Sequence, residues 1–124
     1  MLKIIAFIGA GSFLGGVARY LLGRLISHSA GTPSFWGTLA ANLAGCFLIG
    51  LFYGLFDRYT SVSEHWRLFL TVGFCGGFTT FSTFVNENYA SMTGGRFLEM
   101  ALYASGSFFA GLMMVWLGHR CIEP

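Results

Sequence analysis

The stretch GFCGGFTTFSTF, residues Gly73–Phe84, lies inside a long apolar segment and has the wrong composition for an uninterrupted helix. Two adjacent glycines each cost roughly 1 kcal/mol relative to alanine in a helix interior. The two threonines that follow are β-branched, and their hydroxyls compete for nearby backbone carbonyls. We therefore predict that a membrane helix breaks here. A bilayer tolerates a broken helix only where the freed backbone groups face protein, water or an ion, which makes this stretch the first candidate for function.

The composition is that of a membrane protein. Of the 124 residues, 55% are hydrophobic and only 10% are charged, whereas a soluble domain usually has about 25% charged residues. The net charge of +2, without a basic run, argues against nucleic-acid binding. The cysteines are odd in number and far apart, so we expect small buried hydrophobes rather than a disulfide framework or a metal site: Cys46, Cys75 and Cys121.

Four apolar runs account for most of the chain, and each is close to the ~20 residues that cross a bilayer. They are Ile4–Leu22, Phe35–Phe56, Leu68–Met92 and Phe97–Gly118. The expected connectors are Gly23–Ser34, Asp57–Arg67 and Thr93–Arg96. Among the charged residues only Arg19 and Glu87 fall well inside a run. We predict an all-α integral membrane protein, a single four-helix transmembrane domain over residues 1–124 with a broken third helix.

The orientation of the chain in the membrane is weakly specified. With four spans, both termini share a side with the connector Asp57–Arg67. That side holds Lys3, Arg58, Arg67 and Arg120, and the other holds Arg24, Arg96 and, if it snorkels, Arg19. Orientation follows the Lys/Arg bias of short loops, which is small here. The chain could therefore insert both ways and form an antiparallel dimer.

Small residues at four-residue spacing predict close helix packing. Gly11 and Gly15 have this spacing in the first run, and the second run continues it in Gly37, Ala41 and Gly45. Asn42 lies beside that second face. Two interpretations of its side chain stand equal, an interhelical hydrogen bond and an amide that donates to an anion.

Two other polar features of the spans each have an ordinary and a functional interpretation. Arg19, next to Tyr20, is either a snorkelling interfacial side chain or an anion-attracting group at a water-filled vestibule. In the fourth run, Tyr103 and Ser107 lie four residues apart on one face, with Ser105 nearby. Serine hydroxyls in membrane helices often bond back to their own helix; the alternative is a polar track beside a pore.

Beyond the expected break, Phe81, Phe84 and Glu87 recur at intervals of three and should lie near one helix face. Hydroxyl side chains interleave with them, unlike a lipid-facing surface: Thr79, Thr80, Ser82 and Thr83. An intramembrane carboxylate is a functional hypothesis by default, although an interfacial position near the end of the run would also explain Glu87.

Three segments of the chain resemble the CrcB/Fluc family of fluoride channels. They are GGVARY (Gly15–Tyr20), GTLAANLAG (Gly37–Gly45) and the stretch Gly73–Phe84. The last is long and highly specific. With the four predicted spans, the resemblance extends over the whole chain. Phe78 occupies a position where this family often has leucine.

The resemblance implies a passive channel selective for fluoride in the inner cell membrane, through which a microbial cell loses toxic cytoplasmic fluoride. It implies an antiparallel, dual-topology homodimer with two pores and a structural Na⁺ at its centre. Backbone carbonyls of Gly76 and Thr79 from both subunits would hold this ion. The candidate pore residues that follow are Asn42, Phe81, Phe84, Tyr103, Ser107 and Glu87, with Ser82, Thr83 and Arg19 beside them.

The physical chemistry of these residues agrees with that role. Fluoride is strongly hydrated, so a pore must replace its water with neutral amide and hydroxyl donors that bind moderately at several sites. The positive ring edge of phenylalanine can also face an anion. Sodium prefers oxygen ligands, and a broken helix supplies uncommitted carbonyls.

Two other functions are alternatives, and neither they nor the channel is an enzyme. A dual-topology drug/proton antiporter needs a carboxylate deep in its first helix, and the first run here contains no acidic residue. A non-transporting packing subunit would explain the glycine faces but not the stretch from Gly76 to Phe84.

Overall fold

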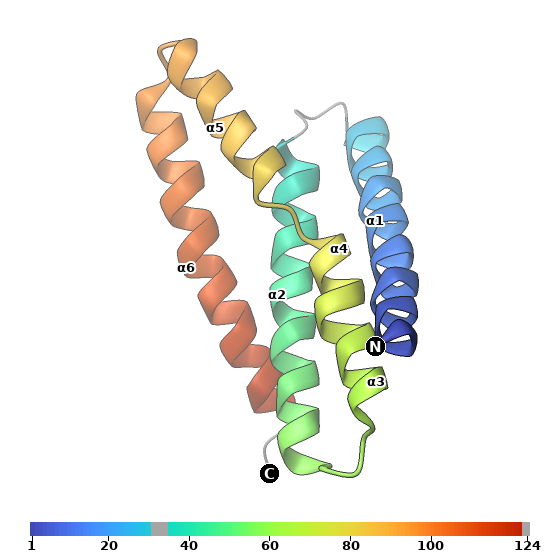
Figure 1. Cartoon of the computed structure of the whole chain (residues 1–124). Coiled ribbons are helices and arrows are strands. Elements are labelled where there is room, and N and C mark those ends of the chain that lie inside the picture. Colours follow the sequence, from blue (N-terminus) through green and yellow to red (C-terminus); the bar gives the residue numbers. More distant parts are fainter. Residues whose placement is uncertain (31–34, 123–124) are drawn as a thin grey trace.

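A computed structural model describes residues 1–30 and 35–122, apart from the side chains of residues 27–30, and these residues form helices joined by short connections (Figure 1). Helices α1 (Leu2–Ala30), α2 (Phe35–Arg58) and α6 (Phe97–Ile122) are continuous. The third span is divided into α3 (Glu64–Leu68), the π-helix η1 (Phe69–Cys75), α4 (Gly76–Phe78) and α5 (Ser82–Thr93). Within the described residues, four segments are long and apolar enough to cross a membrane. The four predicted runs are confirmed.

The helices extend beyond the apolar runs that predicted them. α1 continues past Leu22 to Ala30, so the prediction of a connector over Gly23–Ser34 is wrong for residues 23–30. Residues 31–34 lie outside the described residues. The second connector shrinks to residues 59–63. Hydropathy marks where a helix leaves the hydrocarbon layer, whereas backbone hydrogen bonding continues into the polar interface.

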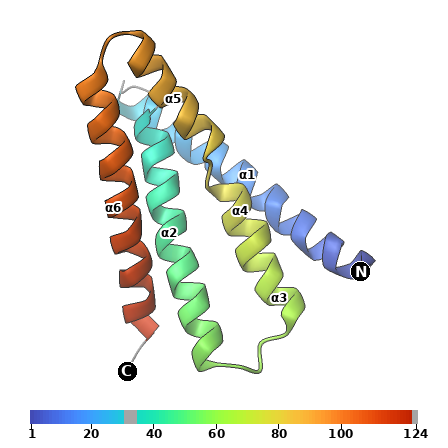
Figure 2. The same cartoon turned by 60° about the vertical axis from the view of Figure 1, so that its left-hand side comes forward.

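Glycines set the packing of two helix pairs, α1 with η1 and α4, and α2 with α6. A Cβ atom on Gly15 would overlap the carbonyl oxygen of Phe74, and one on Gly118 would overlap that of Phe47. Only glycine lets these backbones approach so closely. Figure 2 shows α2 and α6 side by side, while the N-terminal part of α1 diverges from them. The predicted small-residue face of α2 is confirmed, because Gly37, Ala41 and Gly45 are all buried.

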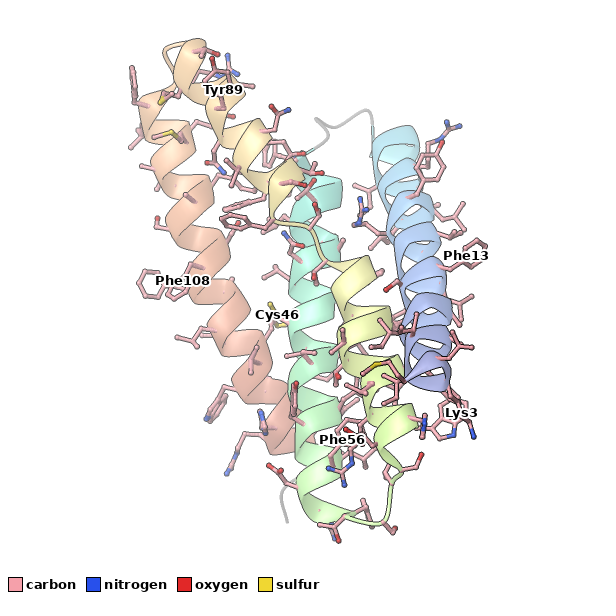
Figure 3. All side chains as sticks on the ribbon, viewed as in Figure 1. Lys3, Phe13, Cys46, Phe56, Tyr89 and Phe108 are labelled. Atoms are coloured by element: carbon pink, nitrogen blue, oxygen red, sulfur yellow. The ribbon has the colours of Figure 1, made fainter. Side chains whose placement is uncertain are left out.

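Large apolar side chains cover the outside of the bundle. Phe13 on α1 and Phe108 on α6 both point away from it (Figure 3). Such a surface suits lipid or a protein partner in the membrane. Of the cysteines, Cys75 is buried as predicted and Cys46 is half-buried. The prediction of burial is wrong for Cys121, which is exposed because it lies beyond the apolar run of α6.

Candidate functional site: a broken helix beside a polar path

The third span breaks at residues 79–81, between α4 and α5, as the sequence predicts (Figure 1). Thr79 leaves the helical conformation for an extended one, with φ −91° and ψ 159°. Its hydroxyl donates to the Cys75 carbonyl at 2.9 Å, which closes the last turn of α4.

The break does not lie at Gly76-Gly77, which we expected to interrupt the helix. Both glycines lie in α4, and the first residue that leaves the helix is Thr79, three residues after Gly76. A Cβ atom on Gly77 would lie 2.6 Å from the carbonyl oxygen of Ser12 and 3.1 Å from the amide nitrogen of Gly16. Close packing against α1 thus explains why residue 77 is glycine, although a glycine inside a helix costs roughly 1 kcal/mol relative to alanine.

Asn42 of α2 holds the broken segment from the side. Its Nδ2 donates to the Thr80 carbonyl at 3.0 Å, and the Thr80 N–H donates to Asn42 Oδ1 at 2.8 Å. The side-chain amide therefore satisfies backbone groups that the interrupted helix leaves free. The interhelical hydrogen bond is confirmed. Because an amide nitrogen carries two hydrogens, one more can serve another acceptor.

Arg19 of α1 also bonds to this region, in a role that the sequence did not indicate. Its Nε donates to the Gly77 carbonyl at 3.2 Å. This carbonyl belongs to the last turn of α4, where helical partners are missing and a positive charge is favourable. Arg19 is half-buried.

The carbonyls of Gly76 and Thr79 fit the donor set expected for a sodium ion. The N–H that Gly76 would bond in a continuous helix belongs to Thr80, and it is directed to Asn42 instead. The corresponding N–H for Thr79 belongs to Thr83, and it is directed to the Thr80 hydroxyl at 3.3 Å. Because both N–H groups bond elsewhere, the carbonyl oxygens of Gly76 and Thr79 lack their helical donors. Free carbonyl oxygens at the end of a half-helix are a known arrangement for binding small cations.

Glu87 of α5 is held by two hydroxyl groups from other helices. Thr38 Oγ1 of α2 donates to Oε2, and Tyr103 Oη of α6 donates to Oε1, each at 2.8 Å. Its carboxylate therefore joins α5 to both α2 and α6. Thr38 is not among the residues predicted from the sequence, although its position four residues before Asn42 puts both on one face of α2.

Aromatic rings connect this carboxylate with the break. The Phe84 and Tyr103 rings lie 5.0 Å apart at 60°, and those of Phe35 and Tyr103 lie 5.2 Å apart at 63°. The Phe81 and Phe84 centroids are 6.3 Å apart, but the Phe81 residue is 77% exposed. The structure thus brings Phe84, Glu87 and Tyr103 together. It leaves Phe81, Ser82 and Thr83 on the outside of the single chain.

The two serines of α6 differ. Ser105 donates to the Ala101 carbonyl at 2.6 Å, the back-bond that its position favours. Ser107 Oγ is buried and, within the described residues, has no hydrogen-bond partner. A buried hydroxyl without a partner is unusual in a native structure, and it leaves a donor free for an acceptor that enters the groove.

Two cavities meet at Tyr103. The first, of about 340 Å³, is here called the vestibule, and its lining is Phe35, Glu87, Ala90, Ser91, Arg96, Glu99 and Tyr103. The second is a groove of about 570 Å³ between α2 and α6, and it includes Tyr103 and Ser107. Phe35, Glu99 and Tyr103 line both cavities. The two cavities therefore adjoin, and the groove, whose lining is mostly apolar, extends from Glu99 and Tyr103 to Ser107.

A broken membrane helix, a half-buried carboxylate with two hydroxyl donors and a cavity at the end of the bundle are features of small polytopic membrane proteins that conduct ions. The chain belongs to the CrcB family. The model of that family, described as CrcB-like protein, Camphor Resistance (CrcB), matches residues 6–119.

Curated relatives agree with the family match. The chain is 43% identical to the "Fluoride-specific ion channel FluC" of Flavobacterium psychrophilum over 94% of both chains. It is 45% identical to the protein of that name from Phocaeicola vulgatus, over 93% of both chains. The protein of that name from Chlorobaculum tepidum is 44% identical, over 95% of this chain and 93% of its own. These relatives are ion channels and not enzymes.

Proposed function

We propose that this protein is a fluoride-specific channel through which cytoplasmic fluoride leaves a microbial cell by passive diffusion across the inner membrane. The name of the relatives supports the choice of ion. The observation that carries the proposal is the buried hydroxyl of Ser107, which has no partner among the described residues and lies in a groove that continues to Tyr103. Such a hydroxyl can donate to an anion that has lost its water.

Fluoride would pass along neutral donors and ring edges. Ser107, the second amide hydrogen of Asn42 and the hydroxyls of Ser82 and Thr83 are neutral, so they bind an anion without trapping it. Phe81 and Phe84 supply positive ring edges. In this proposal Glu87 orients the Tyr103 hydroxyl and lies beside the route, and Arg19 adds positive charge near the break.

The functional unit in this proposal is an antiparallel homodimer with two pores. None of the described residues of α5 is buried, and Phe81 at its start is 77% exposed. A second copy would cover this polar and aromatic surface, which is unsuited to lipid. The small Lys/Arg bias of the connectors is compatible with insertion in both orientations.

A structural Na⁺ at the dimer centre is the cofactor that we propose. The Gly76 and Thr79 carbonyls, whose helical donors are diverted, would hold it. When bound, the ion would neutralise the partial negative charge of carbonyl oxygens that meet at the interface. Asn42 keeps the Gly76 carbonyl available because its Oδ1 accepts the Thr80 N–H, and the Thr80 hydroxyl does the same for the Thr79 carbonyl by accepting the Thr83 N–H.

Fluoride efflux from liposomes tests the proposal. The purified protein is reconstituted, and release of fluoride or chloride is followed with ion-selective electrodes. We expect fluoride release without comparable chloride release. Absence of release would favour the packing subunit, and proton-coupled uptake of a cationic drug would favour the antiporter. Labelling of one engineered cysteine from both sides of the membrane checks the dual topology.

The variant Phe81→Ile sharpens the assignment of the pore. It keeps an apolar side chain but removes the positive ring edge, so we expect fluoride release to fall at least about tenfold, a loss of about 1.4 kcal/mol. The dimer should persist in size-exclusion chromatography. Unchanged release would assign Phe81 to packing.

A further inference from the structure

The turn between α5 and α6 directs one arginine toward the vestibule. Gly95 has φ +77°, a conformation that favours glycine. The Arg96 N–H donates to the Ser91 carbonyl at 2.8 Å. A Cβ atom on Gly94 would lie 2.6 Å from an Arg96 terminal nitrogen, so the guanidinium folds back over Gly94. The two glycines thus position the Arg96 side chain, which lines the vestibule.

Arg96 forms an exposed ion pair with Glu99. Its Nε lies 2.8 Å from Glu99 Oε2, and the side chains are 56% and 47% exposed. Exposed pairs of this kind contribute about 0–1 kcal/mol to stability. Loss of the pair should therefore leave the fold intact. The pair matters for its position at the vestibule rather than for its contribution to stability.

The charges of the vestibule are unfavourable for an anion. Among the described residues, its lining contains two carboxyl groups, Glu87 and Glu99, and one guanidinium, Arg96. With both carboxylates ionised the formal charge of the lining is −1. A cleft with apolar walls concentrates the field of such charges and changes the local concentration of a charged solute.

We propose that Arg96 is the residue that draws anions into the vestibule and that Glu99 limits this attraction. Together they would set how fast fluoride reaches Tyr103. The inference rests on the proposed channel function and adds to it a pair of residues that controls access. Because both side chains are partly exposed, dissolved salt should screen their effect, with a screening length of about 30 Å at 0.01 M and about 10 Å at 0.1 M.

Charge variants test this inference in the liposome assay at fluoride concentrations below saturation. At low ionic strength we expect Arg96→Gln to lower the initial rate of fluoride release about threefold and Glu99→Gln to raise it about twofold. Arg96→Lys keeps the charge and should stay within about 1.5-fold of the unmodified protein. An impermeant salt at about 0.1 M or more should largely abolish both differences.

Arg24→Gln is the matched control. Arg24 is an exposed arginine in the C-terminal part of α1, and it is not among the residues that line the vestibule. Its loss changes the net charge as Arg96→Gln does, and it should leave the rate unchanged. A general surface-charge effect would slow both variants equally and overturn the inference.

The outcomes separate the inference from the proposed function. No fluoride release by the unmodified protein would defeat the channel itself. If that protein conducts, but Arg96→Gln and Glu99→Gln change the rate in the same direction or independently of salt, Arg96 has a structural role in the turn. Failure of Arg96→Lys to conserve the rate would lead to the same conclusion.

Discussion

The two halves of the third span are built for different purposes. Before the break, η1 and α4 bury Thr71, Gly73, Cys75 and Phe78 and pack closely against α1. After the break, α5 has no buried residue in the described chain and places Phe84 and Glu87 against Tyr103 of α6. One half is fixed by glycine contacts between backbones, and the other by a few side-chain bonds.

This difference predicts that variants of the two halves will fail in different measurements. Changes at the glycine contacts should lower the stability of the fold. Changes around α5 should mainly lower fluoride release, because few buried contacts depend on them. The four predictions below proceed from the largest expected effect to the smallest.

Gly15→Ala should cost the most, because the added methyl group overlaps the Phe74 carbonyl oxygen. We expect a loss of about 3 kcal/mol, seen as a lower temperature of thermal unfolding in detergent. Gly9→Ala on the same helix is the control. A Cβ atom there has no neighbour within 4 Å, so stability should stay within about 0.5 kcal/mol. Equal effects would show that close backbone packing does not hold α1 against α4.

Asn42→Ala removes both bonds to the Thr80 backbone. We expect a loss of about 1–2 kcal/mol in stability and a fall of about tenfold or more in fluoride release, since the break is no longer held. Asn88→Ala is the control, because Asn88 donates to the Phe84 carbonyl within its own helix. Similar losses in both variants would mean that the bonds from Asn42 to the Thr80 backbone have no special role in holding the break.

Tyr103→Phe removes one of the two donors to Glu87 and keeps the ring that packs on Phe84. The loss of one hydrogen bond, about 1 kcal/mol, should reduce fluoride release roughly fivefold with little change in unfolding temperature. Tyr89→Phe, at an exposed position on α5, should have no effect. A large fall in stability for Tyr103→Phe would show that α5 depends on this bond for its fold.

Ser107→Ala should have the smallest effect, a fall of about twofold in fluoride release, because one of several donors along the route is lost. Ser105→Ala removes only a back-bond within α6 and should leave release unchanged. If Ser105→Ala proves the more harmful of the two, the groove is not part of the route.

The sequence predicted the spans, the break and the small-residue faces because each depends on local composition or on helical spacing. It was wrong about Gly76 and Gly77, which remain helical, since a local helix cost cannot reveal that Gly77 packs against Ser12. It also missed the bonds from Arg19 to Gly77 and from Thr38 to Glu87. These join residues 58 and 49 positions apart, and no periodicity along one helix encodes them.

The position of the break along the span has an electrical consequence. α5 has 12 residues and is therefore about 18 Å long, a little over half of a hydrocarbon layer of about 30 Å. An ion at the break would cross roughly half of the membrane voltage to reach solution. One charge that crosses the full voltage gains about 2.3 kcal/mol per 100 mV. The energy of a cation held at the break would therefore change by about 1.1 kcal/mol per 100 mV of membrane potential. Its exchange with solution would then respond to the membrane potential.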